Sequence, residues 1–162
     1  KFKEVHLSAA AIITDGLKDL GLLKGDTAEI VEKGAHALFF PHGLGHMLGL
    51  DVHDMEGLGE TFVGYNSETK RSETFGTSNL RLGRTLERHH TITIEPGIYF
   101  IPQLFRKWES ESKFEEHIPY QKLEEWMDFG GIRIEDNVLV TADGYRVLGP
   151  LIPKEIDEIT SL

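Results

Sequence analysis

Apolar side chains recur at spacings of three and four near the start of the chain. This pattern predicts an amphipathic helix over residues 5–20. The expected apolar face consists of Val5, Ala9, Ile12, Ile13, Leu17 and Leu20. Asp26 and Glu29 then have the spacing of a capping box, so we expect a second, short helix that ends at Gly34.

The middle of the chain lacks this periodicity. Residues 35–40 form a short apolar run, which we interpret as a strand closed by Pro41. Residues 42–54 contain several glycines, which disfavour a regular helix. The polar stretch 55–79 is interpreted as a loop.

Strand patterns dominate the second half. Residues 91–95 alternate Thr and Ile, and residues 131–140 alternate again after a charged, mostly helical stretch at 103–128. A turn signal at 142–144 precedes an expected closing strand at 146–151. Helices first and antiparallel strands afterwards predict an α+β fold.

Composition narrows the possible partners. The 162 residues suit one domain, and 27 acidic against 17 basic residues give a net charge of -10. Neither a nucleic acid nor an anionic membrane is an expected partner, because both require clustered Lys and Arg. The chain has no cysteine, which excludes disulfides and thiolate metal sites and fits a reducing, cytoplasmic location.

Candidate metal-binding side chains fall in two groups. His42, His46 and His53 lie within twelve positions, and Glu95 and Glu135 each lie in a strand pattern. Imidazole and carboxylate groups together suit divalent ions such as manganese, cobalt or zinc.

Strand parity adds two supporting residues. Glu95 shares its strand face with Thr93, and Glu135 shares its face with Arg133. An arginine beside a ligand carboxylate orients its oxygens through paired hydrogen bonds. Each glutamate also has an ordinary interpretation, as a strand-end surface residue or as a salt-bridge partner of the arginine. Spacing and composition alone therefore leave an acidic α+β domain that is consistent with metal binding.

Three segments closely resemble the prolidase (Xaa-Pro dipeptidase) and aminopeptidase P family, in the family's order. They are Pro41–His46 with Gly49–Asp54 after it, Glu95–Phe100, and Gly130–Asp136. The resemblance extends from the first expected helix nearly to the C-terminus. It implies the pita-bread fold, with helices packed on a curved antiparallel sheet around a dinuclear metal site, and cleavage of the bond before proline.

The resemblance implies a role for each candidate. His46, Glu95 and Glu135 match metal ligands, with Glu135 bridging two ions and Glu95 also transferring protons. His42 and His53 match histidines that contact the substrate and the tetrahedral intermediate.

Further residues match supporting positions. Arg81 falls where prolidases hold the substrate's carboxylate, and Arg133 matches an arginine that supports the metal ligands, with Thr93 beside them. The implied cofactors are two divalent metal ions, and ligands without sulfur favour Mn2+ over Co2+ or Zn2+.

The sequence departs from the family in two places. The family's two remaining ligands are aspartates upstream of the histidine segment, and nothing here corresponds to them. We therefore expect residues 1–162 to be the C-terminal portion of a single catalytic domain, with its upstream half and an N-terminal domain absent. Such a portion should be inactive alone, and its uncovered apolar surface predicts a homodimer. In addition, residues 88–90 stand where the family usually has Pro-Gly, which predicts an altered turn.

The leading functional hypothesis is hydrolysis of an Xaa-Pro dipeptide by the intact protein. One alternative is an aminopeptidase P, which removes the residue before proline from longer peptides. A second alternative is a non-catalytic pita-bread domain that binds a peptide or protein, and a third is an interaction domain with chance motifs.

Overall fold

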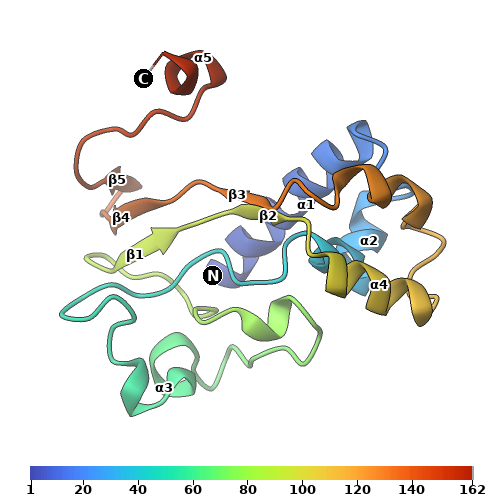
Figure 1. Ribbon diagram of the computed structural model, residues 1–162. Helices are drawn as coiled ribbons and strands as arrows, with labels where there is room; N and C mark the ends of the chain where they lie inside the picture. The colour runs from blue at the N-terminus through green and yellow to red at the C-terminus, as the bar shows by residue number, and fades with distance from the viewer. Residues whose placement is uncertain (162) are drawn as a thin grey trace.

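A computed structural model describes residues 1–161 (Figure 1). The α-helices are α1 (Phe2–Asp19), α2 (Thr27–Lys33), α3 (Glu60–Gly64), α4 (Pro102–Ser110) and α5 (Ile156–Thr160). The 3-10 helices are η1 (Ala35–Leu38), η2 (Glu56–Leu58), η3 (Thr77–Asn79) and η4 (Tyr120–Trp126). The strands are β1 (Thr91–Ile94), β2 (Gly97–Tyr99), β3 (Gly131–Arg133), β4 (Asp136–Val140) and β5 (Tyr145–Val147).

The strands form two antiparallel sheets, one in the order β1-β4-β5 and one that pairs β2 with β3. Ile94 pairs with Asp136 in the first sheet, and Gly97 pairs with Arg133 in the second. The residue pairing therefore continues in the same register from one sheet into the other. Two long strands are thus each interrupted once, and at the interruption Glu95 lies opposite Glu135. The expected strand over residues 131–140 is therefore two strands, interrupted at Ile134 and Glu135, although the N–H of Ile134 still donates to the carbonyl of Pro96 at 3.1 Å.

Helix α1 forms as predicted, but the face that it buries overlaps only in part with the expected one. Its buried residues are Phe2, His6, Ala10, Thr14 and Leu17. Of the expected apolar face, Leu17 is buried and Ala9 and Ile13 pack against the core, whereas Val5, Ile12 and Leu20 are exposed. The polar Thr14 tolerates burial because its hydroxyl donates to the carbonyl of Ala10 at 2.7 Å.

The apolar run at residues 35–40 is not the expected strand. Its first four residues form η1, and all six are fully buried. Gly34 ends α2 in the left-handed conformation with φ of 86°, and this turn leads directly into η1. A short run that is buried on every side has no exposed face, so its sequence contains no periodicity that separates strand from helix.

Two other segments differ partly from expectation. The stretch expected to be a loop, 55–79, contains η2, α3 and η3. The charged stretch 103–128 is helical in two pieces, α4 and η4, which are separated by a turn with positive φ at Ser112 and Phe114. The turns expected at 88–90 and 142–144 are present.

Two apolar clusters form the core. The first joins α2 and η1 to α4 and η4, with Phe39 packed edge-on against Phe100 and Phe105. The second lies between α1 and the β1-β4-β5 sheet, around Phe2, Ile92 and other residues. These clusters hold the strand interruption and the adjacent loops in place.

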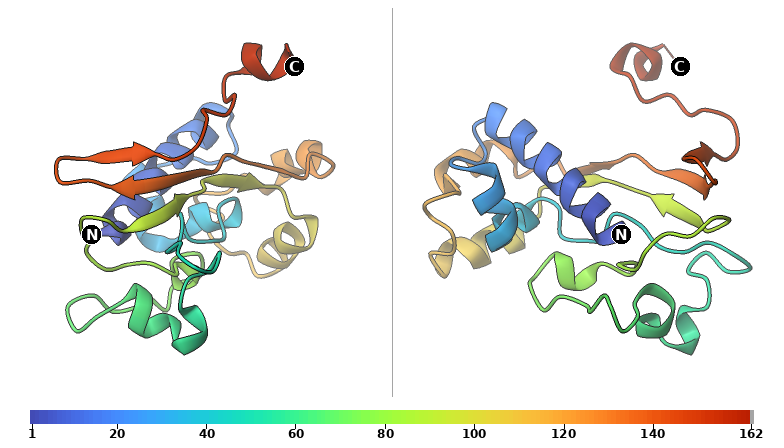
Figure 2. Two further views of the ribbon diagram at one scale, coloured as in Figure 1. Left: turned by 90° about the vertical axis from the view of Figure 1, so that its left-hand side faces the viewer. Right: turned by 180° about the vertical axis from the view of Figure 1, so that it is seen from behind.

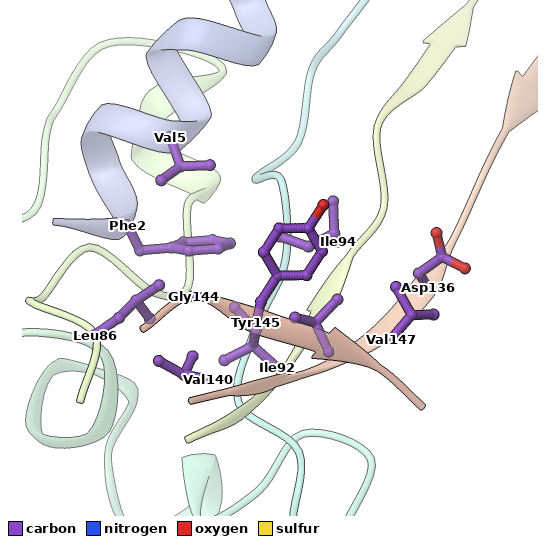
Figure 3. Close-up of a pocket in the computed structure, with 11 residues that line it drawn as sticks. Phe2, Val5, Leu86, Ile92, Ile94, Asp136, Val140, Gly144, Tyr145 and Val147 are labelled. Atoms are coloured by element: carbon purple, nitrogen blue, oxygen red, sulfur yellow. The ribbon is translucent and has the colours of Figure 1, made fainter. Parts of the chain in front are cut away.

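An apolar surface next to the second cluster is open. Phe2 and Val5 of α1 face Ile92, Tyr145 and Val147 of the sheet across a pocket of about 480 Å³ (Figure 3). The C-terminal segment with α5 extends away from the body of the molecule (Figure 2). It exposes Leu151, Ile152, Ile156 and Ile159. The expected homodimer stays a prediction. None of the helices within residues 1–161 has the length and apolar character needed to cross a membrane.

Candidate functional site

The histidine segment runs along β1 and pairs with it over a short stretch, at the edge of the sheet. The backbone N–H of Thr93 donates to the carbonyl of His46 at 3.0 Å, and that of Glu95 donates to Leu44 at 2.7 Å. The two backbones approach so closely that a Cβ on Gly45 would lie 2.0 Å from the carbonyl oxygen of Thr93. The glycines that argued against a helix therefore permit this contact.

His46 and Glu95 meet in the interior of the site. His46 Nε2 lies 3.3 Å from Glu95 Oε1, and both residues are buried. Thr93 joins them, because its Oγ accepts from the His46 backbone N–H at 3.0 Å and donates to Glu95 Oε1 at 3.0 Å. His46 Nδ1 lies 2.9 Å from the carbonyl oxygen of Met47, and this contact orients the ring so that Nε2 faces Glu95 Oε1.

Arg133 connects the two glutamates at the interruption. Its Nη1 lies 3.1 Å from Glu95 Oε2 and 4.0 Å from Glu135 Oε2. The side chain of Glu95 is 11% exposed, whereas that of Glu135 is 45% exposed. Glu95 is thus held by several neighbours, and Glu135 lies at the edge of the site.

His42 occupies another wall of the site. Its Nδ1 donates to the carbonyl of Gly43 at 2.8 Å, and its Nε2 accepts from the hydroxyl of Tyr99 at 3.1 Å. Burial lowers the pKa of His42, and the positive charge of Arg133 adds to this effect. His42 is therefore neutral near pH 7, with both ring nitrogens engaged.

Tyr99 is a site residue that the sequence analysis missed. Its hydroxyl accepts from Arg133 Nε at 2.7 Å while it contacts His42, so it joins two walls of the site. Tyr99 lies in the Glu95–Phe100 motif, and its parity with Glu95 in the extended pattern was the available signal.

His53 and Arg81 lie toward the opening. The exposed ring of His53 packs edge-on against His46, with ring centroids 4.3 Å apart. Arg81 forms an ion pair with Glu56. The cavity has a volume of about 250 Å³. It is lined by His42, Gly43, Gly45, His46, His53, Asn79, Arg81, Glu95 and Arg133.

The side chains of the site offer part of the ligand set that a divalent ion needs. An imidazole Nε2 and a buried carboxylate side by side are suitable ligands for manganese, cobalt or zinc. Within residues 1–161, however, no three His, Asp or Glu side chains gather closely enough to hold an ion. Of the three predicted ligands, the structure brings His46 and Glu95 together and leaves Glu135 outside that pair. The residues fit part of a metal site that requires further ligands.

Known proteins resemble this chain over nearly its whole length. A probable Xaa-Pro aminopeptidase of Phaeosphaeria nodorum is 42% identical over 158 residues, which cover 98% of this chain and 32% of that protein. A probable Xaa-Pro aminopeptidase of Aspergillus clavatus is 41% identical over 162 residues, or 100% of this chain and 33% of that protein. The chain thus spans about a third of the length of these relatives.

Solved structures agree with this result. Proline aminopeptidase P II from Yersinia pestis superposes with a TM-score of 0.65 at 33% identity, covering 99% of this chain and 28% of that one. A zinc-substituted aminopeptidase P of Escherichia coli in complex with product gives a TM-score of 0.65 at 32% identity, with the same coverage. The predicted α+β, pita-bread architecture is confirmed. Residues 1–142 match metallopeptidase family M24, and the chain belongs to that family.

Proposed function

We propose that this chain is the C-terminal portion of the catalytic domain of a metal-dependent Xaa-Pro aminopeptidase. The observation that carries the proposal is the buried pair of His46 and Glu95, joined by Thr93, in one cavity with two further histidines. The names of the relatives support this choice of substrate.

Hydrolysis of Xaa-Pro dipeptides is the second candidate. Arg81 lines the cavity, as the resemblance to prolidases implies for a residue that binds the substrate's carboxylate. Its guanidinium already has Glu56 as a partner, however, and this favours the aminopeptidase.

We propose that His46 and Glu95 hold one divalent ion and that Glu135 joins them when upstream ligands complete the site. Bound divalent ions polarise a carbonyl group and lower the pKa of water. Ligands with nitrogen and oxygen but no sulfur favour manganese. The contact of His46 Nδ1 with the carbonyl of Met47 would orient the ring for Nε2 to act as a ligand.

The chain's own residues have distinct tasks in this proposal. Glu95 accepts a proton from the attacking water and passes it to the imino nitrogen of proline. The ring nitrogens of His42 are already engaged, so the exposed His53 is the better donor to the oxygen that gains charge. Arg133 orients the Glu95 carboxylate by donating to its Oε2.

The test compares two preparations with manganese present. The full-length protein that contains this chain should cleave an Xaa-Pro-Xaa tripeptide and spare the matching Xaa-Ala-Xaa tripeptide. The 162-residue chain alone should release no product above background, because its metal site lacks ligands. Turnover by the isolated chain, or failure of the metal-loaded full-length protein, would overturn the proposal.

A further inference from the structure

An ion pair at the wall of the cavity involves the arginine that was expected to bind substrate. Arg81 Nη1 contacts Glu56 Oε2. The Glu56 side chain is only 13% exposed, and that of Arg81 is 42% exposed. A carboxylate of the protein therefore already occupies the guanidinium that lines the cavity.

The backbone places Glu56 at this position. Met55 adopts a φ of 58°, and η2 begins at the next residue. The N–H of Glu56 donates to the carbonyl of His53 at 3.4 Å. One turn thus carries both the histidine that packs on His46 and the glutamate that pairs with Arg81, so the pair belongs to the wall of the site.

Among the described residues, neither arginine that lines the cavity is unpaired and available for a substrate's carboxylate. Arg133, the other arginine of the lining, is paired with Glu95. A carboxylate that displaced Glu56 from Arg81 would leave a largely buried anion without its partner, which is costly. A carboxylate that shared Arg81 would lie beside another negative charge.

We infer that Glu56 determines substrate specificity at this site: by pairing with Arg81 it disfavours a free carboxylate on proline and selects peptides in which proline continues into an amide. The inference rests on the proposed function and defines its substrate class. Glu56 acts through Arg81 and is a positioning residue.

The experiment uses two substrates that differ in one charge. Ala-Pro carries a prolyl carboxylate, and Ala-Pro-amide does not. We expect the full-length, metal-loaded protein to have the higher kcat/KM with the amide. Glu56→Gln should raise the ratio of kcat/KM for Ala-Pro over Ala-Pro-amide roughly three- to tenfold, as expected for loss of one partly exposed charge contact. Glu56→Leu should shift the ratio in the same direction if the glutamine variant does not fold.

A matched control comes from a neighbouring ion pair. Glu60 pairs with Arg71 at 2.9 Å in the same part of the chain, and neither residue lines the cavity. Glu60→Gln should leave the ratio unchanged. In an Arg81→Ala background, Glu56→Gln should also have little effect, because its action requires the arginine.

The outcomes separate the two ideas. If the unmodified protein cleaves neither substrate, the proposed function fails. If it cleaves them and Glu56→Gln leaves their ratio unchanged, or shifts it equally without Arg81, the inference about Glu56 is wrong and the function stands.

Discussion

Two regions of this molecule bury polar side chains, and they differ in how those side chains are paired. In the functional site, Thr93 hydrogen-bonds to both His46 and Glu95, and Arg133 pairs with the same glutamate. Where α1 packs against η1, His6 and His36 are fully buried, and none of their ring nitrogens has a hydrogen-bond partner among the described residues.

The difference shows why only one region can hold charge. Burial lowers the pKa of His6 to about 4, with smaller contributions from His36, His42 and Lys3. Burial also lowers the pKa of His36. Both imidazoles are therefore neutral at pH 7, whereas the buried Glu95 keeps an arginine beside it.

The regions are also in contact. The ring of Phe40 lies 5.3 Å from His6 on one side and 5.0 Å from His42 on the other, measured between centroids. His6 thus supports one wall of the site through a single aromatic side chain. Charge in a buried position depends here on partners, and the following changes test that conclusion from the largest expected effect to the smallest.

Removing Glu95, the side chain with the most partners in the site, should have the largest effect on activity. Glu95→Ala in the full-length protein should lower kcat/KM by about 10³-fold or more, because it removes a proposed ligand and the proton carrier together. Steady-state kinetics on an Xaa-Pro-Xaa tripeptide measure this loss. Glu87→Ala, which removes an exposed partner of Arg84, serves as the control. A loss below tenfold for Glu95→Ala would mean that the paired region is not the active site.

Acid should destabilise the region without partners. The unfolded chain binds protons near the ordinary histidine pKa of 6.5, and folded His6 does so only near 4. The stabilisation is thus complete above about pH 6.5 and is lost as the pH falls toward 4. Its size for His6 is up to roughly 3 kcal/mol of unfolding free energy. Urea titrations of the chain between pH 7.5 and 4 measure this change.

Two variants assign that pH dependence. His6→Phe should reduce the pH dependence over this range, because it removes one buried histidine whose pKa is lowered in the folded state. His36 and His42, whose pKa values are also lowered, should account for part of what remains. His89→Asn should leave the curve unchanged, since His89 is exposed and asparagine tolerates its positive φ. If His6→Phe keeps the full pH dependence, the buried histidine is not its source.

Loss of the Thr93 hydroxyl, which contacts both His46 and Glu95, should have an intermediate effect. Thr93→Val keeps the shape of the side chain but leaves the backbone N–H of His46 without its acceptor. We expect a decrease in unfolding free energy of about 1–2 kcal/mol, measured by denaturant titration. In the full-length protein, metal affinity should fall roughly 10- to 100-fold. Thr91→Val, in the same strand, should change both quantities less.

The smallest effect on stability is expected at the edge of the site. Glu135→Ala should change the unfolding free energy of the chain by less than about 0.5 kcal/mol, because its side chain is 45% exposed and 4.0 Å from Arg133. A loss above 1 kcal/mol would show that Glu135 is held as firmly as Glu95. Comparing Glu135→Ala with Glu95→Ala in one denaturant series sharpens the contrast between a glutamate with several partners and one at the edge of the site.

Helices and strands were predictable from the sequence where one of their faces is apolar and the other is polar. The helix at the start and the strand at 91–95 were found in this way. The buried face of α1 was predictable only in part: Leu17 is buried as expected, but His6 and Thr14 are polar and buried, and the apolar Ile12 is exposed. Burial of polar groups depends on the elements packed against them, which helical periodicity does not describe.

The site was predictable as a set of residue types but not as an arrangement. The motifs identified His46 and Glu95, which the structure places together. The sequence contained no signal for the pair of Glu56 with Arg81, because 25 positions separate them and only the turn at Met55 brings them into contact.

Residue order and strand parity alone placed Thr93 with Glu95 and Arg133 with Glu135, since side chains alternate along any extended strand. Only the tertiary structure decided that Glu95 lies opposite Glu135, that the histidine segment lies beside β1, and that Arg81 already has a partner. Parity is a property of the local backbone, whereas register and ion pairing arise from contacts between distant segments, which are set by how the whole core packs.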